Sequence, residues 1–187
     1  MKRIISFAFI AVFLVACNSD KKDEPAAAKS DAKADGAKPP VELIMDSNFI
    51  NSAKATMTAF ENKDIEGYTA NMDDNVKFRW CSGDSLTGKQ AVKDYYTGRF
   101  NIIDHIKFSN PIFLPVMANE SPNGGQTSAG KWMLNWYQVD VKYKNGKELR
   151  FWVHNANHFN AAGKIDEAAQ YIDKQPIMEA TKDLVKK

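Results

Sequence analysis

Aromatic rings, carboxamides and one carboxylate gather on two neighbouring segments, 131–144 and 147–159, in which polar and apolar residues alternate. A two-residue turn at Asn145-Gly146 is expected to join these segments as a hairpin that pairs Lys144 with Lys147. The face assigned to the interior by this register carries Trp132, Leu134, Trp136, Gln138 and Asp140 beside Leu149, Phe151, Val153, Asn155 and Asn157. Such a mixture is typical of pockets that bind small molecules.

The predicted ligand-binding set is Trp80, Tyr96, Trp132, Trp136, Asp140, Phe151 and Asn155. Trp80 and Tyr96 come from other segments and are expected to lie beside this face. In the alternative interpretation, Trp132 and Trp136 are ordinary core residues and Asp140 lies at a solvated end.

The histidines and the second cysteine do not predict a metal or nucleophilic site. His154 and His158 lie four residues apart in an alternating segment, and on a strand that spacing separates them by about 13 Å, too far to share one ion. Cys81 has no histidine near it in the sequence and is expected to be buried and unreactive. The sequence has no glycine-rich phosphate loop and no G-x-S-x-G motif. We therefore assign no catalytic residue, no metal and no cofactor.

Cys17 is the predicted site of lipid attachment. A short basic segment, Met1-Lys2-Arg3, precedes an apolar run over 4–15, which is shorter than the roughly 20 residues of a spanning helix. The run ends in Leu14-Val15-Ala16-Cys17, which resembles a bacterial lipobox. We predict a lipoprotein signal peptide over 1–16 and palmitate-type lipidation of Cys17, with enough acyl chains for stable anchoring. An ordinary secretory signal that happens to contain a cysteine is the alternative.

Residues 17–40 are expected to form the lipidated cysteine and a disordered tether. After Cys17 this segment has no large apolar residue, so it cannot bury enough surface to offset its ordering entropy. Asn18, where an aspartate would resemble an inner-membrane retention signal, favours the outer membrane. We expect a lipid anchor in the cell envelope, on the periplasmic side or at the cell surface.

The overall charge gives no support to a nucleic-acid partner. The 187 residues carry a formal net charge of only +2, and many of the lysines lie near the two ends of the chain. No basic stripe with interleaved aromatic residues remains, so we expect no nucleic-acid binding.

The folded domain is predicted over 41–175, with 176–187 as a tail that could form a short helix. Apolar residues at three- and four-residue spacing, from Ile50 to Phe60, indicate the first helix. Further helices are expected over 64–72 and 89–100, and strands over 76–80, 105–117, 131–144, 147–159 and 164–173. Three helices followed by a strongly bent antiparallel meander make an α+β fold.

Three sequence motifs occur in a familiar order. They are Phe60-Glu61-Asn62-Lys63-Asp64-Ile65-Glu66-Gly67 followed by Asp73-Asp74-Asn75-Val76; Gly88-Lys89-Gln90-Ala91-Val92; and Phe159-Asn160-Ala161-Ala162-Gly163-Lys164-Ile165 ending in Gln170-Tyr171-Ile172-Asp173. Together they resemble the nuclear transport factor 2-like, or SnoaL-like, superfamily over nearly all of 47–173. The resemblance implies a cone-shaped fold, in which three N-terminal helices pack in a strongly curved antiparallel sheet that encloses a pocket.

The resemblance also implies what an enzyme of this superfamily would need. Ketosteroid isomerases and polyketide cyclases use a carboxylate base on the first long strand and hydrogen-bond donors deep in the pocket. Here the position of the base falls at Arg79 or Trp80, the donor falls near Asn155, and the tyrosine of the first helix falls near Thr56. Asp140 is the remaining candidate base, or His154 if the face assignment is wrong.

These departures favour a membrane-anchored protein that binds a small apolar or aromatic ligand without catalysis. The alternatives are an isomerase, cyclase or dehydratase with a non-standard base, and a surface module that uses the outer face of the sheet. The outer face is also predicted to be apolar, and in related domains that face commonly pairs two subunits. We therefore expect a homodimer through the outer sheet face.

Overall fold

The computed structural model describes residues 38–44, 46–121 and 128–185. The predicted signal peptide over 1–16, Cys17 and the tether up to residue 37 lie outside the described residues. The described residues form four helices and seven strands, with β1 (Val41–Leu43) as the first element.

The first three helices form where the sequence predicted them. They are α1 (Ser47–Glu61), α2 (Ile65–Thr69) and α3 (Lys89–Ile102). Asp46 precedes α1 and Asp64 precedes α2, and each carboxylate accepts a hydrogen bond from a backbone amide of the first turn. Such N-caps satisfy amides that have no partner within the helix, which is why the helices begin at these residues.

The strands of the described residues form one mixed sheet. They are β1, β2 (Met72–Trp80), β3 (Ser85–Thr87), β4 (Ile103–Ala118), β5 (Gly130–Tyr143), β6 (Glu148–Phe159) and β7 (Ile165–Tyr171), in the order β1-β4-β5-β6-β7-β2-β3. The predicted antiparallel meander is confirmed from β4 to β7, and β2 adds to β7 in parallel. The short strands β1 and β3 were not predicted.

A bulge in β4 changes which side chains face the helices. The pairing with β5 shifts between Ser109 and Ile112, and Asn110 has a φ of 52° just before Pro111. Proline favours an edge position or a bulge because it cannot donate to the ladder, and Pro111 lies at this bulge. As a result, Phe108 points to the interior, whereas Ile112 is 56% exposed.

The turn between β5 and β6 differs from the predicted one by a single residue. Tyr143 donates its amide to the Lys147 carbonyl at 2.8 Å, so three residues, 144–146, form the turn. Gly146 has a φ of 84°, as expected for the glycine of a three-residue turn with a bulge. Asn145 is held from outside the hairpin, because its amide donates to the Ala180 carbonyl at 2.8 Å.

This shift overturns half of the predicted face assignment. Asp140 pairs with Arg150 and Trp136 with His154, where the sequence analysis paired Asp140 with Phe151 and Trp136 with Asn155. Because side chains alternate between faces, a slip of one residue moves every side chain of β5 to the opposite face. The predicted faces are therefore correct for β6 and wrong for β5.

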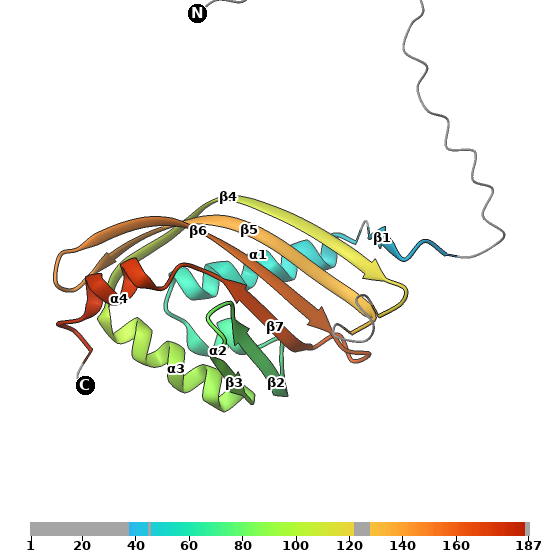
Figure 1. The fold of residues 1–187 in the computed structure, drawn as a ribbon, viewed down its shortest axis with the longest axis horizontal. Helices are drawn as coiled ribbons and strands as arrows, with labels where there is room; N and C mark the ends of the chain where they lie inside the picture. Colours follow the sequence, from blue (N-terminus) through green and yellow to red (C-terminus); the bar gives the residue numbers. More distant parts are fainter. Residues whose placement is uncertain (1–37, 45, 122–127, 186–187) are drawn as a thin grey trace, which may run out of the picture. The chain divides into compact units, whose positions relative to one another are not determined.

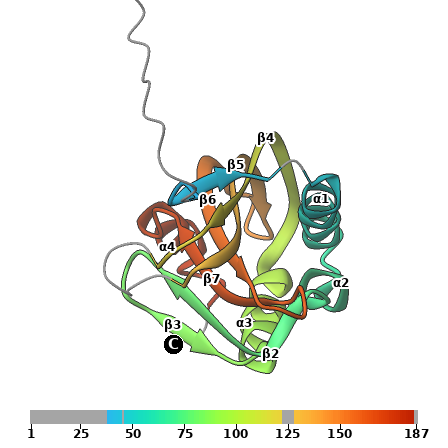
Figure 2. The ribbon, with the colours of Figure 1, turned by 90° about the vertical axis from the view of Figure 1, so that its right-hand side faces the viewer.

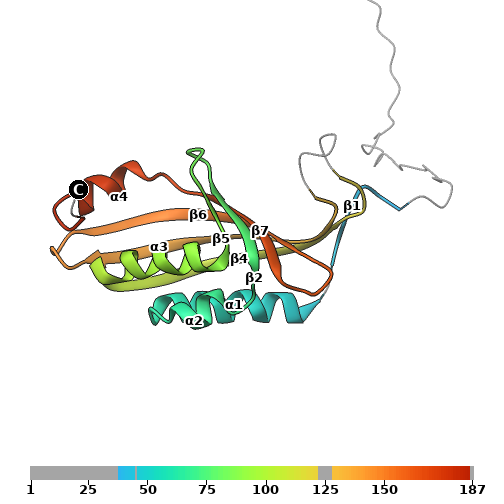
Figure 3. The same ribbon diagram turned by 90° about the horizontal axis from the view of Figure 1, so that it is seen from below.

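The sheet curves around the helices and leaves its other face uncovered by them. Figure 1 shows β4, β5 and β6 arching over α1 and α3, and Figures 2 and 3 show the three N-terminal helices on one side of the sheet. Phe60 of α1 contacts Phe100 of α3 and Phe108 of β4, with ring centroids 4.8 and 5.5 Å apart. The predicted α+β cone with a strongly curved sheet is confirmed.

A fourth helix, α4 (Gln175–Thr181), lies at the open end of this arch. A short helix was predicted within the tail over 176–187, and α4 buries Ile177 and Ala180 against the same core as β5 and β6. Its residues therefore complete the core at this end.

Among the described residues, none of the helices combines the length and the apolar character that crossing a membrane requires.

Candidate functional site

A cavity of about 180 Å³ lies between the inner face of the sheet and the helices. Most of its wall is apolar or aromatic, with Phe60 and Tyr68 on the helix side and Val139 and Val153 on the sheet. An apolar cavity of roughly 150 Å³ is large enough to hold benzene, so this one has room for a single ring with short substituents.

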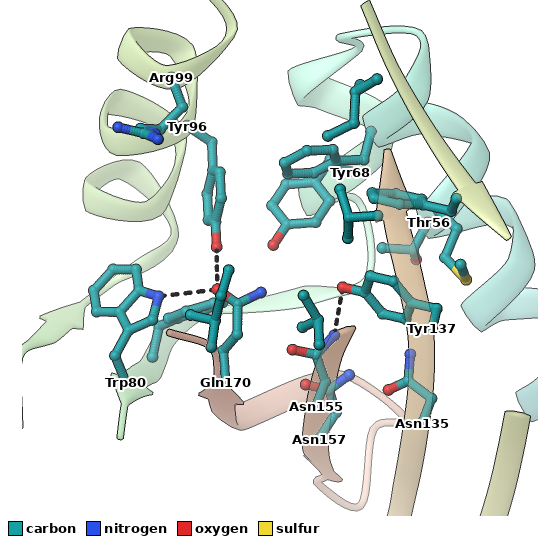
Figure 4. A pocket seen from close by; sticks show the side chains of 18 of the residues that line it. Thr56, Tyr68, Trp80, Tyr96, Arg99, Asn135, Tyr137, Asn155, Asn157 and Gln170 are labelled. Atoms are coloured by element: carbon teal, nitrogen blue, oxygen red, sulfur yellow. Dashed lines mark hydrogen bonds between the residues drawn. The ribbon is translucent and has the colours of Figure 1, made fainter. Parts of the chain in front are cut away.

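Gln170 accepts two hydrogen bonds on one side of the cavity. Its side-chain oxygen accepts a hydrogen bond from the Trp80 indole at 3.0 Å and one from the Tyr96 hydroxyl at 3.3 Å (Figure 4). Trp80 and Tyr96 are only 6% and 5% exposed. Gln170 thus satisfies two buried donors and fixes the orientation of both rings.

A second polar group lies on the floor formed by β5 and β6. Asn155 donates its amide to the Tyr137 hydroxyl at 2.8 Å. Asn135 is directly opposite Asn155 in the ladder and is 4% exposed, yet its side-chain oxygen has no hydrogen-bond partner among the described residues. Figure 4 shows both of these carboxamides and that of Asn157 on the same floor. Buried polar atoms are nearly always paired, so the free oxygen of Asn135 marks a place for a donor.

The cavity tyrosines are neutral. Burial raises the pKa of Tyr137 to about 12, although its hydrogen bonds with Asn155 and Gln170 partly offset this effect. Burial also raises the pKa of Tyr68 and of Tyr96 well above the ordinary value of 10.0. At neutral pH these hydroxyls keep their protons, so they can orient a ligand but cannot act as bases.

The described lining contains no side chain suited to be a general base. No carboxylate, imidazole or thiol is among the residues of the wall that the structure describes. Of the two residues at which the sequence resemblance places a base, Trp80 lines the cavity, whereas Arg79 is not among the described lining residues and pairs with Glu167 at 3.3 Å. Thr56, at which the resemblance places a tyrosine, also lines the cavity. The described wall can therefore position a ligand through amides, hydroxyls and the cations Arg99 and Lys174.

Of the predicted ligand-binding residues, Trp80, Tyr96, Phe151 and Asn155 line the cavity. They come from β2, α3 and β6, which the sequence placed correctly.

Trp132, Trp136 and Asp140 do not line it, which corrects the prediction. All three lie on the outer face of β5 because of the one-residue shift in the hairpin. Trp132 is buried there and donates its indole to the Ser128 carbonyl at 2.9 Å. Asp140 accepts a hydrogen bond from Arg150.

His154 is also excluded as a base within the cavity. Its ring stacks on Trp136 on the outer face, with centroids 4.4 Å apart and planes at 6°. Burial lowers the pKa of His154 from its ordinary 6.5. His158 lies four residues further along β6, and its Nδ1 is 2.6 Å from a carboxylate oxygen of Asp166. Within the described residues, histidine, cysteine and acidic side chains form no group of three that could hold a metal ion.

Cys81 corrects a further expectation. The sequence predicted a buried thiol, but Cys81 is exposed and its sulfur lies 3.4 Å from the Ile172 carbonyl oxygen. It follows Trp80 at the end of β2, where the chain leaves the sheet.

Sequence reasoning missed Asn135, Tyr137, Gln170 and Arg99 as cavity residues. The first two were placed on the wrong face with the rest of β5. Gln170 could have been found from the sequence. It lies two residues from each of the apolar residues Ala168 and Ile172, and residues at this spacing share one face of a strand.

No protein-family model matches the sequence, and no curated protein matches it. Solved structures do share its fold. A nuclear transport factor 2-like protein of unknown function from Burkholderia pseudomallei superposes with a TM-score of 0.57 at 14% identity, over 72% of this chain and 98% of that one. A proposed isomerase from Bacillus subtilis gives a TM-score of 0.56 at 18% identity, over 71% and 91%. TerC, co-crystallized with polyporic acid, gives 0.54 at 14% identity, over 71% and 97%.

These similarities establish the fold alone, because sequence identities this low carry no information about activity. The described domain has the nuclear transport factor 2-like fold, as the sequence motifs implied.

Proposed function

We propose that this protein is a lipid-anchored binding protein of the cell envelope, which holds a small apolar or aromatic ligand in its cavity without changing it chemically. The observation that carries this proposal is the composition of the wall. A largely apolar cavity of about 180 Å³ contains oriented amides and neutral hydroxyls, but none of its described residues is a carboxylate, imidazole or thiol. Such a site can select and retain a molecule, whereas proton transfer by an isomerase would need a base.

The fold itself supports a ligand of this kind. TerC, which shares it, was crystallized with polyporic acid. The proposed isomerase from Bacillus subtilis shares the same fold, so the fold alone does not separate binding from catalysis. The absence of a carboxylate, imidazole or thiol from the described wall is what favours binding.

Native mass spectrometry of the protein purified from its own cells tests the proposal. We expect a small molecule to remain bound to the natural chain. The matched variant is Ala53→Phe, because Ala53 of α1 lines the cavity and a phenyl ring at this position would occupy it. The variant should lose the bound molecule while its circular dichroism spectrum stays unchanged.

A natural chain that carries no small molecule and binds no aromatic compound would contradict the binding proposal. Conversion of the recovered molecule by the purified protein would instead support the alternative of an enzyme with a non-standard base.

We also propose that Cys17 anchors the protein to a membrane, in the outer membrane of a cell that has one. The support lies in the sequence, since the apolar run over 4–15 and the Leu14-Val15-Ala16-Cys17 motif are what lipoprotein processing requires. A ligand held near a membrane surface would be available to other envelope components.

A homodimer through the outer sheet face is a further part of the proposal. On the face opposite the helices, Ile112, Trp152 and Tyr171 are 56%, 51% and 50% exposed. Contiguous apolar surface of this kind marks interaction sites on soluble domains. Analytical ultracentrifugation should show a dimer that Trp152→Glu dissociates, and a natural chain that stays monomeric at millimolar concentration would refute the dimer.

A further inference from the structure

Arg99 is a charged residue of the cavity wall that has no ionic partner among the described residues. It lies in the last turns of α3, lines the cavity and is half-buried. Its guanidinium lies close to the Tyr143 hydroxyl and partly offsets the rise that burial causes in the pKa of that tyrosine. No carboxylate of the described residues pairs with Arg99.

The other cation of the described wall differs from Arg99 in this respect. Lys174 pairs with Asp84 at 2.8 Å and lies over the Trp80 ring, 4.2 Å from its centroid. Since no acidic side chain of the described chain lines the cavity, Arg99 leaves its wall with an unbalanced positive charge. Burying a cation without a partner is costly, so the site favours an anionic ligand.

Asn135, at the other end of the cavity, offers a hydrogen-bond acceptor. Asn135 is 4% exposed, and its side-chain oxygen has no hydrogen-bond partner among the described residues. Figure 4 shows Arg99 on α3 at one end of the view and Asn135 on β5 at the other, with the rings of Tyr96, Tyr68 and Tyr137 between them. Arg99 contacts Tyr143, which lies eight residues along β5 from Asn135, so at about 3.3 Å per residue the two groups are too far apart for a one-ring ligand to reach both.

We propose that the ligand is a small aromatic carboxylic acid whose carboxylate pairs with Arg99. This inference rests on the proposed binding function and defines its ligand class. A planar guanidinium binds a carboxylate through two parallel hydrogen bonds, and the tyrosine rings of the cavity wall suit an aromatic body. The cavity of about 180 Å³ limits the body to about one ring.

The test uses four probes of nearly equal size with the full chain purified in detergent. 4-Hydroxybenzoate carries both polar groups, 4-methylbenzoate lacks the donor, 4-hydroxybenzamide lacks the charge, and 4-methylbenzamide lacks both. Isothermal titration calorimetry gives the four dissociation constants. Because a charge-assisted hydrogen bond contributes about tenfold or more in affinity, 4-hydroxybenzoate should bind at least about tenfold more tightly than 4-hydroxybenzamide.

Variants assign the charge preference to Arg99. Arg99→Met should abolish the preference for carboxylate over amide, and Arg99→Lys should restore part of it. Asn135→Leu, which changes the wall far from Arg99, should leave the charge preference intact. Arg150→Met, which removes a cation from the opposite face of the sheet, should also leave it intact. Each ratio compares two ligands on the same protein, so a partly unfolded variant still gives a valid answer.

Two results would overturn the inference: equal affinity of the natural chain for carboxylate and amide, or an undiminished carboxylate preference in Arg99→Met. If the neutral amides bind and the acids do not, the ligand class is wrong while the binding function stands. If none of the four probes binds, the binding function fails with it.

Discussion

Replacing Gln170 with leucine would remove the acceptor that two cavity rings share. The leucine has nearly the same size, so the change isolates the hydrogen bonds from the packing. Trp80 and Tyr96 would keep their places in the wall, but the indole N–H and the hydroxyl would lose the oxygen at 3.0 and 3.3 Å.

The size of the effect follows from how well each donor can find another partner. The Trp80 indole is part of a side chain that is 6% exposed, and leaving a buried donor unpaired costs about 1–3 kcal/mol. Tyr96 loses a longer bond and also contacts the Tyr68 hydroxyl, so its share lies at the low end of the range. We expect Gln170→Leu to lower the free energy of unfolding by about 2 kcal/mol, which corresponds to roughly 4–8 °C in Tm for a domain of this length.

Urea unfolding followed by tryptophan fluorescence measures the change. The control is Gln138→Leu, the same substitution on the outer face, where the amide only meets the exposed Asn110 at 3.4 Å. The control should change the free energy of unfolding by less than about 0.5 kcal/mol. Equal effects of the two variants would refute the reasoning, because they would show that the hydrogen bonds of Gln170 to Trp80 and Tyr96 do not stabilise the domain.

Asn135→Leu should act in the opposite direction and raise the free energy of unfolding by about 1 kcal/mol in the same assay. The reason is that it removes a buried oxygen that has no hydrogen-bond partner among the described residues. A lower free energy of unfolding would mean that this oxygen is paired. His154 has a folded-state pKa below its ordinary 6.5, so the unfolded chain takes up the proton first. The stability from His154 is therefore complete above pH 6.5 and falls as the pH is lowered toward the folded-state pKa, a decline that His154→Phe should remove when unfolding is compared on both sides of 6.5. Cys17→Ser should move the protein from the membrane fraction to the soluble fraction of lysed cells, and a variant that still sediments with membranes would argue against the lipid anchor.

Much of the fold could be predicted because its elements have strong local signals. The apolar spacing from Ile50 to Phe60 and the caps Asp46 and Asp64 define α1 and α2 without reference to any distant residue. The alternation in the second half of the sequence predicted the four strands of the meander. The bulge in β4 also has a local cause, since Pro111 has no N–H to donate wherever the strand lies.

The site could be predicted only in part, because its composition depends on the register of one hairpin. Asn145-Gly146 is compatible with both a two-residue and a three-residue turn, and the two place opposite faces of β5 toward the helices. The structure has the three-residue turn, with the Asn145 amide bound to the Ala180 carbonyl from α4. That contact spans 35 residues and has no local signature.

The sequence by itself determined the main helices and strands, their order and the curved α+β fold, while the lipid anchor on Cys17 stays a prediction. These follow from spacing, caps and composition, which act between residues near one another in the chain. Only the tertiary structure decided that Asn135 and Tyr137, and not Trp136 and Asp140, face the cavity, and that Arg99 lines it without an acidic partner among the described residues. The reason is that a side chain's face depends on the register of the strands, and the observed register buries Tyr137, Val139 and Val141 against residues that are distant in the chain.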